Sequence, residues 1–170
     1  MKPTEFTHLI NPIRDKLFRF ALRMLKDPAA AKDVVQDVCI KLWQQRDRLD
    51  EIDNLEAWSM RLVRNRCLDV LRSPSSRMGG LDEKPEECDP HLTPGDLTEQ
   101  SDLMRHLRRL MQALPQKQRL VMHLRDLEGL SYQEIADTLD MTMAQVKVNI
   151  FRARTRIRTE LEKTNAYGLR

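Results

Sequence analysis

The fold of this chain is decided by the stretch GLSYQEIA at residues 129–136. Ser131 followed by Glu134 has the spacing of a capping box: the hydroxyl accepts a hydrogen bond from the Glu134 amide, and the carboxylate accepts one from the Ser131 amide. Leu130 and Ile135 occupy the two positions of a hydrophobic staple. The pattern predicts that a helix begins here, after Gly129 has ended the helix before it.

A second helix is expected to follow almost at once. The first ends near Leu139, and Asp140-Met141 predicts a tight turn because aspartate tolerates the left-handed backbone conformation better than most residues. Thr142 and Gln145 have the spacing of a second capping box. Two capped helices joined by so short a turn are typical of a helix-turn-helix motif.

This second helix separates an apolar face from a basic one. The apolar side chains recur at steps of three and four and are expected to point inward: Val146, Ile150, Ala153, Ile157 and Leu161. Five positive charges and no acid fall within twelve residues: Lys147, Arg152, Arg154, Arg156 and Arg158. Such a helix fits the major groove of DNA, with its first side chains at base edges and later arginines at phosphates. The alternative is a solvated basic helix, or one that covers an acidic partner.

Amphipathic helices are also expected upstream. Two stripes have helical spacing: Leu103, Leu107, Leu110 and Leu114 near the motif, and Leu9, Ile13, Leu17, Phe20 and Met24 near the N-terminus. Pro115 restarts the chain into a helix that bears Leu120, Val121 and Leu124. Another helix is predicted to begin with Asp27 as its N-terminal cap and Pro28 as its first residue. The apolar face of this helix carries Ala31, Val34, Val38 and Leu42.

A third N-terminal helix is predicted from its cap, Asn54, to about Arg72. Its expected core contacts are Trp58, Leu62 and Val70. The polar residues 46–53 before it are predicted to form a loop. No segment alternates as a strand would, so the fold class is all-α.

The segment 73–100 differs in composition and net charge from the sequence on either side of it. Proline, glycine and serine interrupt any helix there, and its net charge is −5, against +3 for residues 1–72 and +5 for residues 101–170. This composition predicts a flexible acidic linker between two small helical domains, 1–72 and 101–170, the second being the helix-turn-helix domain. The two basic domains suggest a polyanionic partner such as nucleic acid.

Other features narrow the class of protein. The sequence has neither an apolar run long enough to span a membrane nor a secretory signal, so direct membrane insertion is not expected. Three widely spaced cysteines, Cys39, Cys67 and Cys88, indicate a reducing cytoplasm. No nucleophile with a base, no phosphate-binding glycine loop and no metal-ligand cluster beyond a lone Cys88 and His91 is present. We therefore expect no enzyme, no cofactor and no metal site.

The motifs resemble those of a known family. Residues 129–136, Val146-Lys147 and residues 151–154 resemble the promoter −35-reading region of bacterial sigma factors. Residues 33–37 with Leu42-Trp43 resemble the polymerase-binding helix of that family, and Ala57-Trp58, Arg64-Asn65 and residues 69–72 resemble its −10 region. Because only a linker separates the two matches, the chain resembles the extracytoplasmic-function (ECF) subgroup.

The resemblance implies roles for individual residues. The surface that would dock on the clamp coiled coil of the largest subunit of core RNA polymerase is Asp33, Gln36 and Asp37. The −10 element would be bound by Arg61, Arg64, Asn65 and Arg72, with Asp69 orienting Arg72, and residues 47–53 match a loop that captures a flipped-out base. The −35 element would be bound by Gln145, Lys147, Val148, Phe151, Arg152 and Arg154. Where the family often carries a more polar pair, this chain has Val148 and Asn149, and Val148 could contact a thymine methyl.

The resulting hypothesis is an alternative sigma factor that binds core RNA polymerase and directs promoter-specific transcription initiation. The resemblance also implies an anti-sigma factor as a partner, beside core polymerase and promoter DNA. The alternative is a helix-turn-helix transcriptional regulator that binds DNA without acting as a polymerase subunit. A third hypothesis, a redox enzyme using Cys39 or Cys67, lacks a paired or positively poised thiol.

Overall fold

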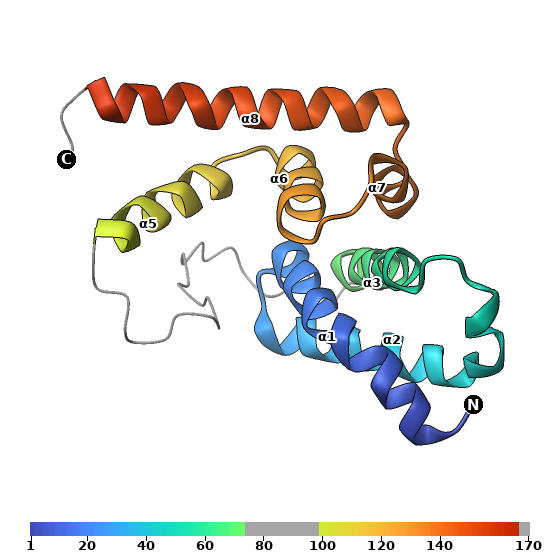
Figure 1. Cartoon of the computed structure of the whole chain (residues 1–170). Helices are drawn as coiled ribbons and strands as arrows, with labels where there is room; N and C mark the ends of the chain where they lie inside the picture. The colour runs from blue at the N-terminus through green and yellow to red at the C-terminus, as the bar shows by residue number, and fades with distance from the viewer. Residues whose placement is uncertain (74–98, 167–170) are drawn as a thin grey trace.

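Helices form all the regular secondary structure in the described residues, 1–73 and 99–166, of the computed structural model (Figure 1). Side-chain positions are described for residues 1–73 and 104–163. The prediction of an all-α chain with two helical domains is confirmed over these ranges. The predicted linker falls mostly at 74–98, outside the described residues, as do Cys88 and His91.

Three α-helices and a 3-10 turn form the N-terminal domain: α1 (Pro3–Leu25), α2 (Pro28–Gln44), η1 (Arg46–Glu51) and α3 (Leu55–Arg72). Two of the predicted caps are confirmed. The Asp27 carboxylate accepts hydrogen bonds from the amides of Ala29 and Ala30 (2.9 and 3.2 Å), and the Asn54 side chain accepts one from the amide of Ala57 (2.9 Å). These bonds satisfy amides that have no partner within the helix and so define where α2 and α3 begin.

The core of this domain differs in detail from the prediction. Leu9 is 40% exposed and its neighbour Ile10 is buried, so the stripe on α1 starts one position later than expected. On α3 the buried apolar side chains are Met60, Val63 and Cys67, whereas the predicted Trp58, Leu62 and Val70 are only half-buried. The reason is that α3 packs against both α1 and α2, and the direction in which these helices cross, rather than periodicity alone, selects its innermost line.

The C-terminal domain contains α5 (Glu99–Gln112), α6 (Gln116–Met122), the π-helical turn η2 (His123–Leu127), α7 (Tyr132–Leu139) and α8 (Met143–Ala166). The sequence did not predict the π-turn. It is closed by a hydrogen bond from the Glu128 amide to the His123 carbonyl (3.1 Å), which brings these two residues together at the end of the turn. Gly129 then reverses the chain with φ +78°, as expected of a glycine after a helix C-terminus.

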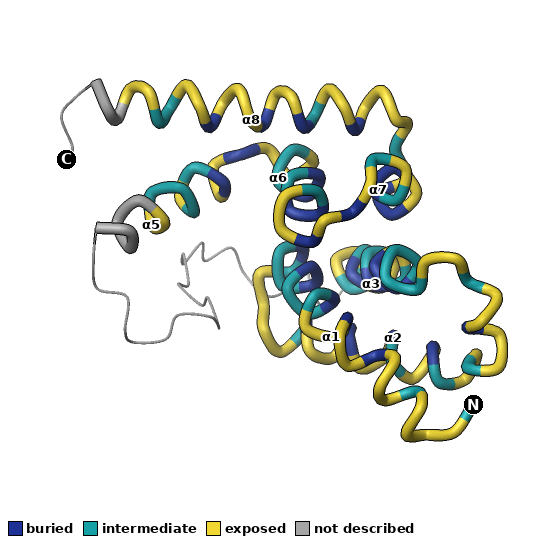
Figure 2. The backbone as a smooth tube through the Cα atoms, viewed as in Figure 1, coloured by how far each residue is buried: buried dark blue, intermediate teal, exposed yellow. Residues whose placement is uncertain are grey.

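The two domains pack against each other. Buried residues of α1, α2 and α3 belong to one continuous core with Leu124, Leu130, Ile135 and Leu139. Figure 1 shows α7 lying beside α3, and α6 and η2 above the C-terminal end of α1. Figure 2 shows buried backbone on both sides of this junction. We call this the closed arrangement; the sequence left the relative placement of the domains open.

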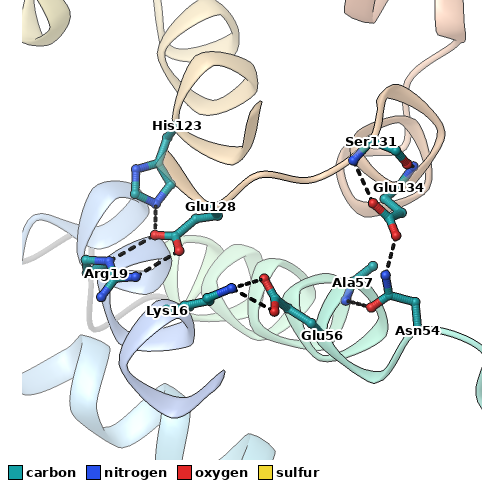
Figure 3. Close-up of polar contacts among 9 residues, drawn as sticks. All are labelled: Lys16, Arg19, Asn54, Glu56, Ala57, His123, Glu128, Ser131 and Glu134. Atoms are coloured by element: carbon teal, nitrogen blue, oxygen red, sulfur yellow. Dashed lines mark hydrogen bonds and ion pairs between the residues drawn. The ribbon is translucent and has the colours of Figure 1, made fainter. Parts of the chain in front are cut away.

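Polar side chains cross the junction (Figure 3). Arg19 donates two hydrogen bonds to the Glu128 carboxylate, at 2.9 and 2.8 Å, and Nε2 of His123 lies 3.3 Å from the same carboxylate. Phe20 stacks on His123 with ring centroids 6.3 Å apart. We call these four residues the interdomain cluster. Since Arg19 and Phe20 lie on α1 while His123 and Glu128 lie on η2 and directly after it, the cluster joins one domain to the other.

Candidate nucleic-acid and protein interfaces

The helix-turn-helix has the local structure that its sequence predicts. The Ser131 amide donates to Glu134 (2.6 Å) and the Glu134 amide to the Ser131 hydroxyl (3.2 Å). Asp140 adopts the left-handed conformation with φ 55°. The second capping box is also formed, with bonds of 2.9 and 3.2 Å between Thr142 and Gln145. Both predicted capping boxes and the turn are therefore confirmed.

The side of α8 that faces away from the domain carries most of the predicted −35 residues. Its inward side buries Val146, Ile150, Ala153 and Ile157, as predicted. Lys147 and Arg152 are exposed, as are Val148 (44%) and Phe151 (71%). Val148 and Phe151 are three residues apart, so they form an exposed apolar pair on the same helix face as Lys147 and Arg152.

Three other residues of this helix are already engaged. Arg154 is bound to Asp126 through two hydrogen bonds (3.4 and 2.5 Å), which raise the pKa of its guanidinium, so part of its charge is compensated within the protein. Gln145 contributes its side-chain oxygen to the cap of α8, and Asn149 donates its amide to the Gln145 carbonyl (2.8 Å). Of the predicted −35 residues, Lys147, Val148, Phe151 and Arg152 therefore have side chains that remain available for a ligand.

The predicted −10 residues lie along α3. Arg61, Asn65 and Arg72 are exposed and Arg64 is half-buried, and a hydrogen bond of 3.4 Å runs from the Arg64 guanidinium to the Asn65 side chain. No ion pair joins Asp69 to Arg72, so the expected orientation of Arg72 by Asp69 is absent from this structure. Helix α7 contacts the start of α3, where Glu134 meets Asn54 and Thr138 meets Ala57, so these basic residues further along α3 remain largely exposed.

The segment 46–53, predicted as a loop, contains the 3-10 helix η1, so this prediction was wrong. Leu49 is buried and holds the turn against the domain. Before it, Trp43 lies between the ring of Phe6 (centroids 5.1 Å apart, edge-on) and the guanidinium of Arg46 (4.5 Å). Local apolar and cation–π contacts therefore order a segment whose polar composition suggested a loop.

The acidic surface predicted to bind polymerase is formed on α2. Asp33, Gln36 and Asp37 are all exposed, while the opposite side of the helix is buried. Asp37 forms an ion pair with Arg66 of α3 (2.8 Å), and among the described residues Asp33 has no such partner. Ile40, which is 49% exposed, continues the same face at helical spacing; sequence reasoning missed it, although its position four residues after Gln36 was a usable signal.

The described residues hold no group of three or more metal-ligating side chains. Every helix within the described ranges is too short or too polar to cross a lipid bilayer. Burial raises the pKa of the Cys67 thiol to about 12 and also raises that of Cys39, against a small opposing effect of Arg14. Neither thiol is poised as a nucleophile at neutral pH, which disfavours the redox hypothesis.

The interdomain cluster is the main feature that sequence reasoning missed. Burial alone would raise the pKa of the Glu128 carboxyl, but the contacts from His123 and Arg19 outweigh it and bring the pKa to about 2. Burial lowers the pKa of His123, and Glu128 opposes this only in part. A charged carboxylate, a neutral imidazole and a guanidinium therefore meet at the junction at neutral pH.

Acidification is expected to destabilise the protein through this cluster. Both pKa values lie below their ordinary range, so the folded state binds fewer protons than the unfolded state. The free energy of unfolding should fall as the pH drops below about 6.5, where exposed histidine gains its proton, and fall further from about 4.5 toward 2 as Glu128 is protonated. Denaturant unfolding between pH 7.5 and about 2 measures both parts of this decrease. His123→Phe, which keeps a ring against Phe20, should flatten the upper part of the profile; an unchanged profile would contradict the assignment.

Comparisons with known proteins agree with this geometry. The family described as Sigma-70 region 2 matches residues 9–77, and the one described as Sigma-70, region 4 matches residues 104–157. The RNA polymerase sigma-E factor of Streptomyces avermitilis is 32% identical over 158 residues, which cover 93% of this chain and 86% of that protein. The ECF RNA polymerase sigma-E factor of Escherichia coli is 30% identical over 139 residues, covering 76% and 73% of the two chains.

A solved structure shares the fold over almost its whole length. It is the sigma factor RpoE of Bartonella quintana, crystallised with the anti-sigma factor NepR, with a TM-score of 0.72, 23% identity, and coverage of 93% of this chain and 97% of that one. At that identity the likeness concerns the fold alone. Taken with the sequence relatives and the two matched regions, the chain belongs to the sigma-70 family of bacterial RNA polymerase sigma factors, in the extracytoplasmic-function subgroup.

Proposed function

We propose that this alternative sigma factor divides its work between the two helical domains. Residues 1–72 bind core RNA polymerase and the −10 element, and residues 101–170 bind the −35 element. The observation that carries the proposal is the exposed face of α8, where Lys147, Val148, Phe151 and Arg152 point away from a doubly capped helix-turn-helix. A helix presented in this way has the form that enters the major groove.

The −35 contact is made by two kinds of group. Lys147 and Arg152 supply positive charge to phosphates and base edges, and Val148 and Phe151 supply apolar surface that suits thymine methyl groups. Arg154, paired with Asp126, and Gln145, engaged in the cap, contribute less than their positions in the sequence suggest. The −10 contact uses Arg61, Arg64, Asn65 and Arg72, which line one exposed side of α3.

The polymerase contact is made by α2. Asp33, Gln36 and Asp37 form an acidic patch that suits a basic surface on the clamp coiled coil of the largest polymerase subunit, and Ile40 adds an apolar contact beside it. The protein acts in the cytoplasm, where promoter DNA and polymerase are found. An anti-sigma factor is a further proposed partner, supported by the Bartonella quintana relative, whose structure was solved with one.

Run-off transcription tests the proposal directly. Purified core polymerase is supplied with a pool of genomic fragments, with and without the chain, and the 5′ ends of the transcripts are mapped. Specific starts should occur only when the chain is present, and should share two short elements upstream. Tight binding of the chain to duplex DNA without any specific start would contradict its role as a polymerase subunit.

A further inference from the structure

The outward face of α8 carries an apolar strip, Phe151 and Val148, with a cation on each side. At about 3.6 residues per turn, successive residues are about 100° apart around the helix axis, so the exposed side chains follow in the order Lys147, Phe151, Val148 and Arg152. They span about 140° of the circumference, and the two apolar groups occupy its middle. Figure 2 shows this side of α8 exposed and the opposite side buried against the domain.

The polar side chains nearest to the strip are already engaged within α8. The Gln145 side-chain oxygen accepts a hydrogen bond from the Thr142 amide (2.9 Å), and the Asn149 side-chain amide donates one to the Gln145 carbonyl (2.8 Å). The middle of the reading face therefore offers a ligand apolar surface in place of hydrogen-bonding groups.

Such a face suits one feature of the major groove. A helix in the groove places the middle of its face against the base edges and its sides toward the phosphates of the two strands. The base edges present hydrogen-bond donors and acceptors, and their one apolar group is the methyl on C5 of thymine. Valine and phenylalanine side chains have no donor or acceptor, so packing them against any other group at these edges leaves a polar atom without a partner.

We propose that the strip recognises C5-methyl groups of pyrimidines, whichever pyrimidine carries them. Thymine and 5-methylcytosine have the same methyl on C5 but differ beside it, where thymine has a hydrogen-bond acceptor and cytosine a donor. An apolar side chain contacts the methyl and does not distinguish the acceptor from the donor. The two methylated bases are therefore equivalent at the positions that face Val148 and Phe151, whereas uracil and unmodified cytosine are bound less tightly. The inference rests on the proposed function, in which α8 reads the −35 element.

This mode of recognition makes promoter binding sensitive to cytosine methylation. A promoter with cytosine at a position that faces the strip gains affinity when a methyl group is added to C5 of that base. A promoter with thymine at the same position already carries the methyl and is bound tightly without modification. The protein therefore responds to the methylation of a promoter whose base sequence is unchanged.

The test is a methyl scan of a bound duplex. The duplex comes from a start mapped by run-off transcription and is bound by the holoenzyme; if no start occurs, it is enriched from a random pool by binding to the full chain. Each thymine of the bound element is replaced in turn by uracil, which removes only the methyl, by cytosine and by 5-methylcytosine, with guanine opposite the last two. Affinity is measured by fluorescence anisotropy of the labelled duplex.

The expected result depends only on the methyl group. At each thymine that faces the strip, uracil should weaken binding by about fourfold, the effect of withdrawing one methyl-sized group from an apolar contact. Cytosine should weaken binding at least as much. Restoring the methyl on 5-methylcytosine should recover most of the affinity, although the base pair is different.

Two variants assign the methyl groups to individual side chains. Val148→Ala and Phe151→Ala each remove apolar surface and keep a strong helix former. Each should lose most of the uracil effect at the thymine it faces and keep the effect at the other. The matched control is Met104→Ala on α5: its side chain is 49% exposed, and α5 packs on the later part of α8, around Ile157. This control should retain both uracil effects, and circular dichroism verifies that all three variants keep their helices.

Three results would overturn the inference. If uracil weakens binding at no position, no methyl group is recognised. If uracil weakens binding equally in wild type and in both variants, the methyl acts through the shape of the DNA and not through the strip. If 5-methylcytosine binds as weakly as cytosine, hydrogen bonds and not methyl groups determine the preference.

The proposed function fails in a different way. A chain that supports no specific start, yet shows the uracil effect on the enriched duplex, would overturn its role as a polymerase subunit and leave the methyl recognition standing. Specific starts without any uracil effect would have the opposite meaning. A chain that supports no start and enriches no duplex would overturn both.

Discussion

Arg152→Glu is expected to abolish transcription from promoters that depend on the −35 element while leaving the affinity for core polymerase unchanged. Arg152 is exposed on the outward face of α8 and has no ion-pair partner among the described residues, so its charge is available to DNA. One base-specific contact contributes about 1–3 kcal/mol of discrimination, and a carboxylate at the same place adds repulsion from phosphates. Lys147→Glu should behave in the same way. Run-off transcription and a core-binding assay are measured side by side.

The neighbouring Arg154 provides the matched comparison. Arg154→Ala removes a cation from the same helix, but one that Asp126 already compensates, so promoter activity should fall much less than with Arg152→Ala. Equal losses would mean that helix charge, and not the position of the side chain, determines binding. A loss of core binding together with promoter activity in Arg152→Glu would contradict the division of roles between the two domains.

The contrast between Arg152 and Arg154 shows where prediction from sequence reaches its limit. Helical periodicity correctly placed both on the exposed side of α8, because the period of a helix determines which positions share a face. The ion pair of Arg154 with Asp126 was not predictable, since it joins residues 28 apart and depends on how α8 crosses the turn before α7. The ion pair between Asp37 and Arg66 was not predictable either, since these residues are 29 positions apart.

Helix caps were predicted well because they depend only on residues that are close together in the sequence. Each cap joins a side chain to a backbone amide two or three residues further on, so the spacing of the residues is enough to predict it. The four examples are Asp27, Asn54, Ser131 and Thr142. The closed arrangement lies at the other extreme. Its central pair joins Arg19 to Glu128 across 109 positions, and its π-turn leaves no simple signature in the residues that form it. Neither could be predicted from spacing.

Asp33→Lys is expected to weaken binding to core polymerase by at least about thirtyfold, because losing one partner of an interfacial ion pair costs roughly 2–5 kcal/mol. Asp33 is exposed on α2 and has no ion-pair partner among the described residues, so the substitution should leave the fold intact. The charge-matched control is Glu162→Lys, an exposed acid near the end of α8, which should bind polymerase like wild type. Affinity is measured by fluorescence anisotropy of labelled chain titrated with core enzyme.

Asp37 allows a sharper version of this experiment, because its carboxylate is shared between the proposed interface and Arg66. Asp37→Arg combined with Arg66→Asp retains an ion pair between α2 and α3 but presents a cation where polymerase should meet an anion. If polymerase recognises the carboxylate itself, the double variant should unfold like wild type in denaturant and still fail to bind core enzyme. If the pair matters only because it joins α2 to α3, the swap should restore binding that Asp37→Arg alone loses. The two outcomes separate a residue that contacts the partner from one that only supports the helix on which the contact is made.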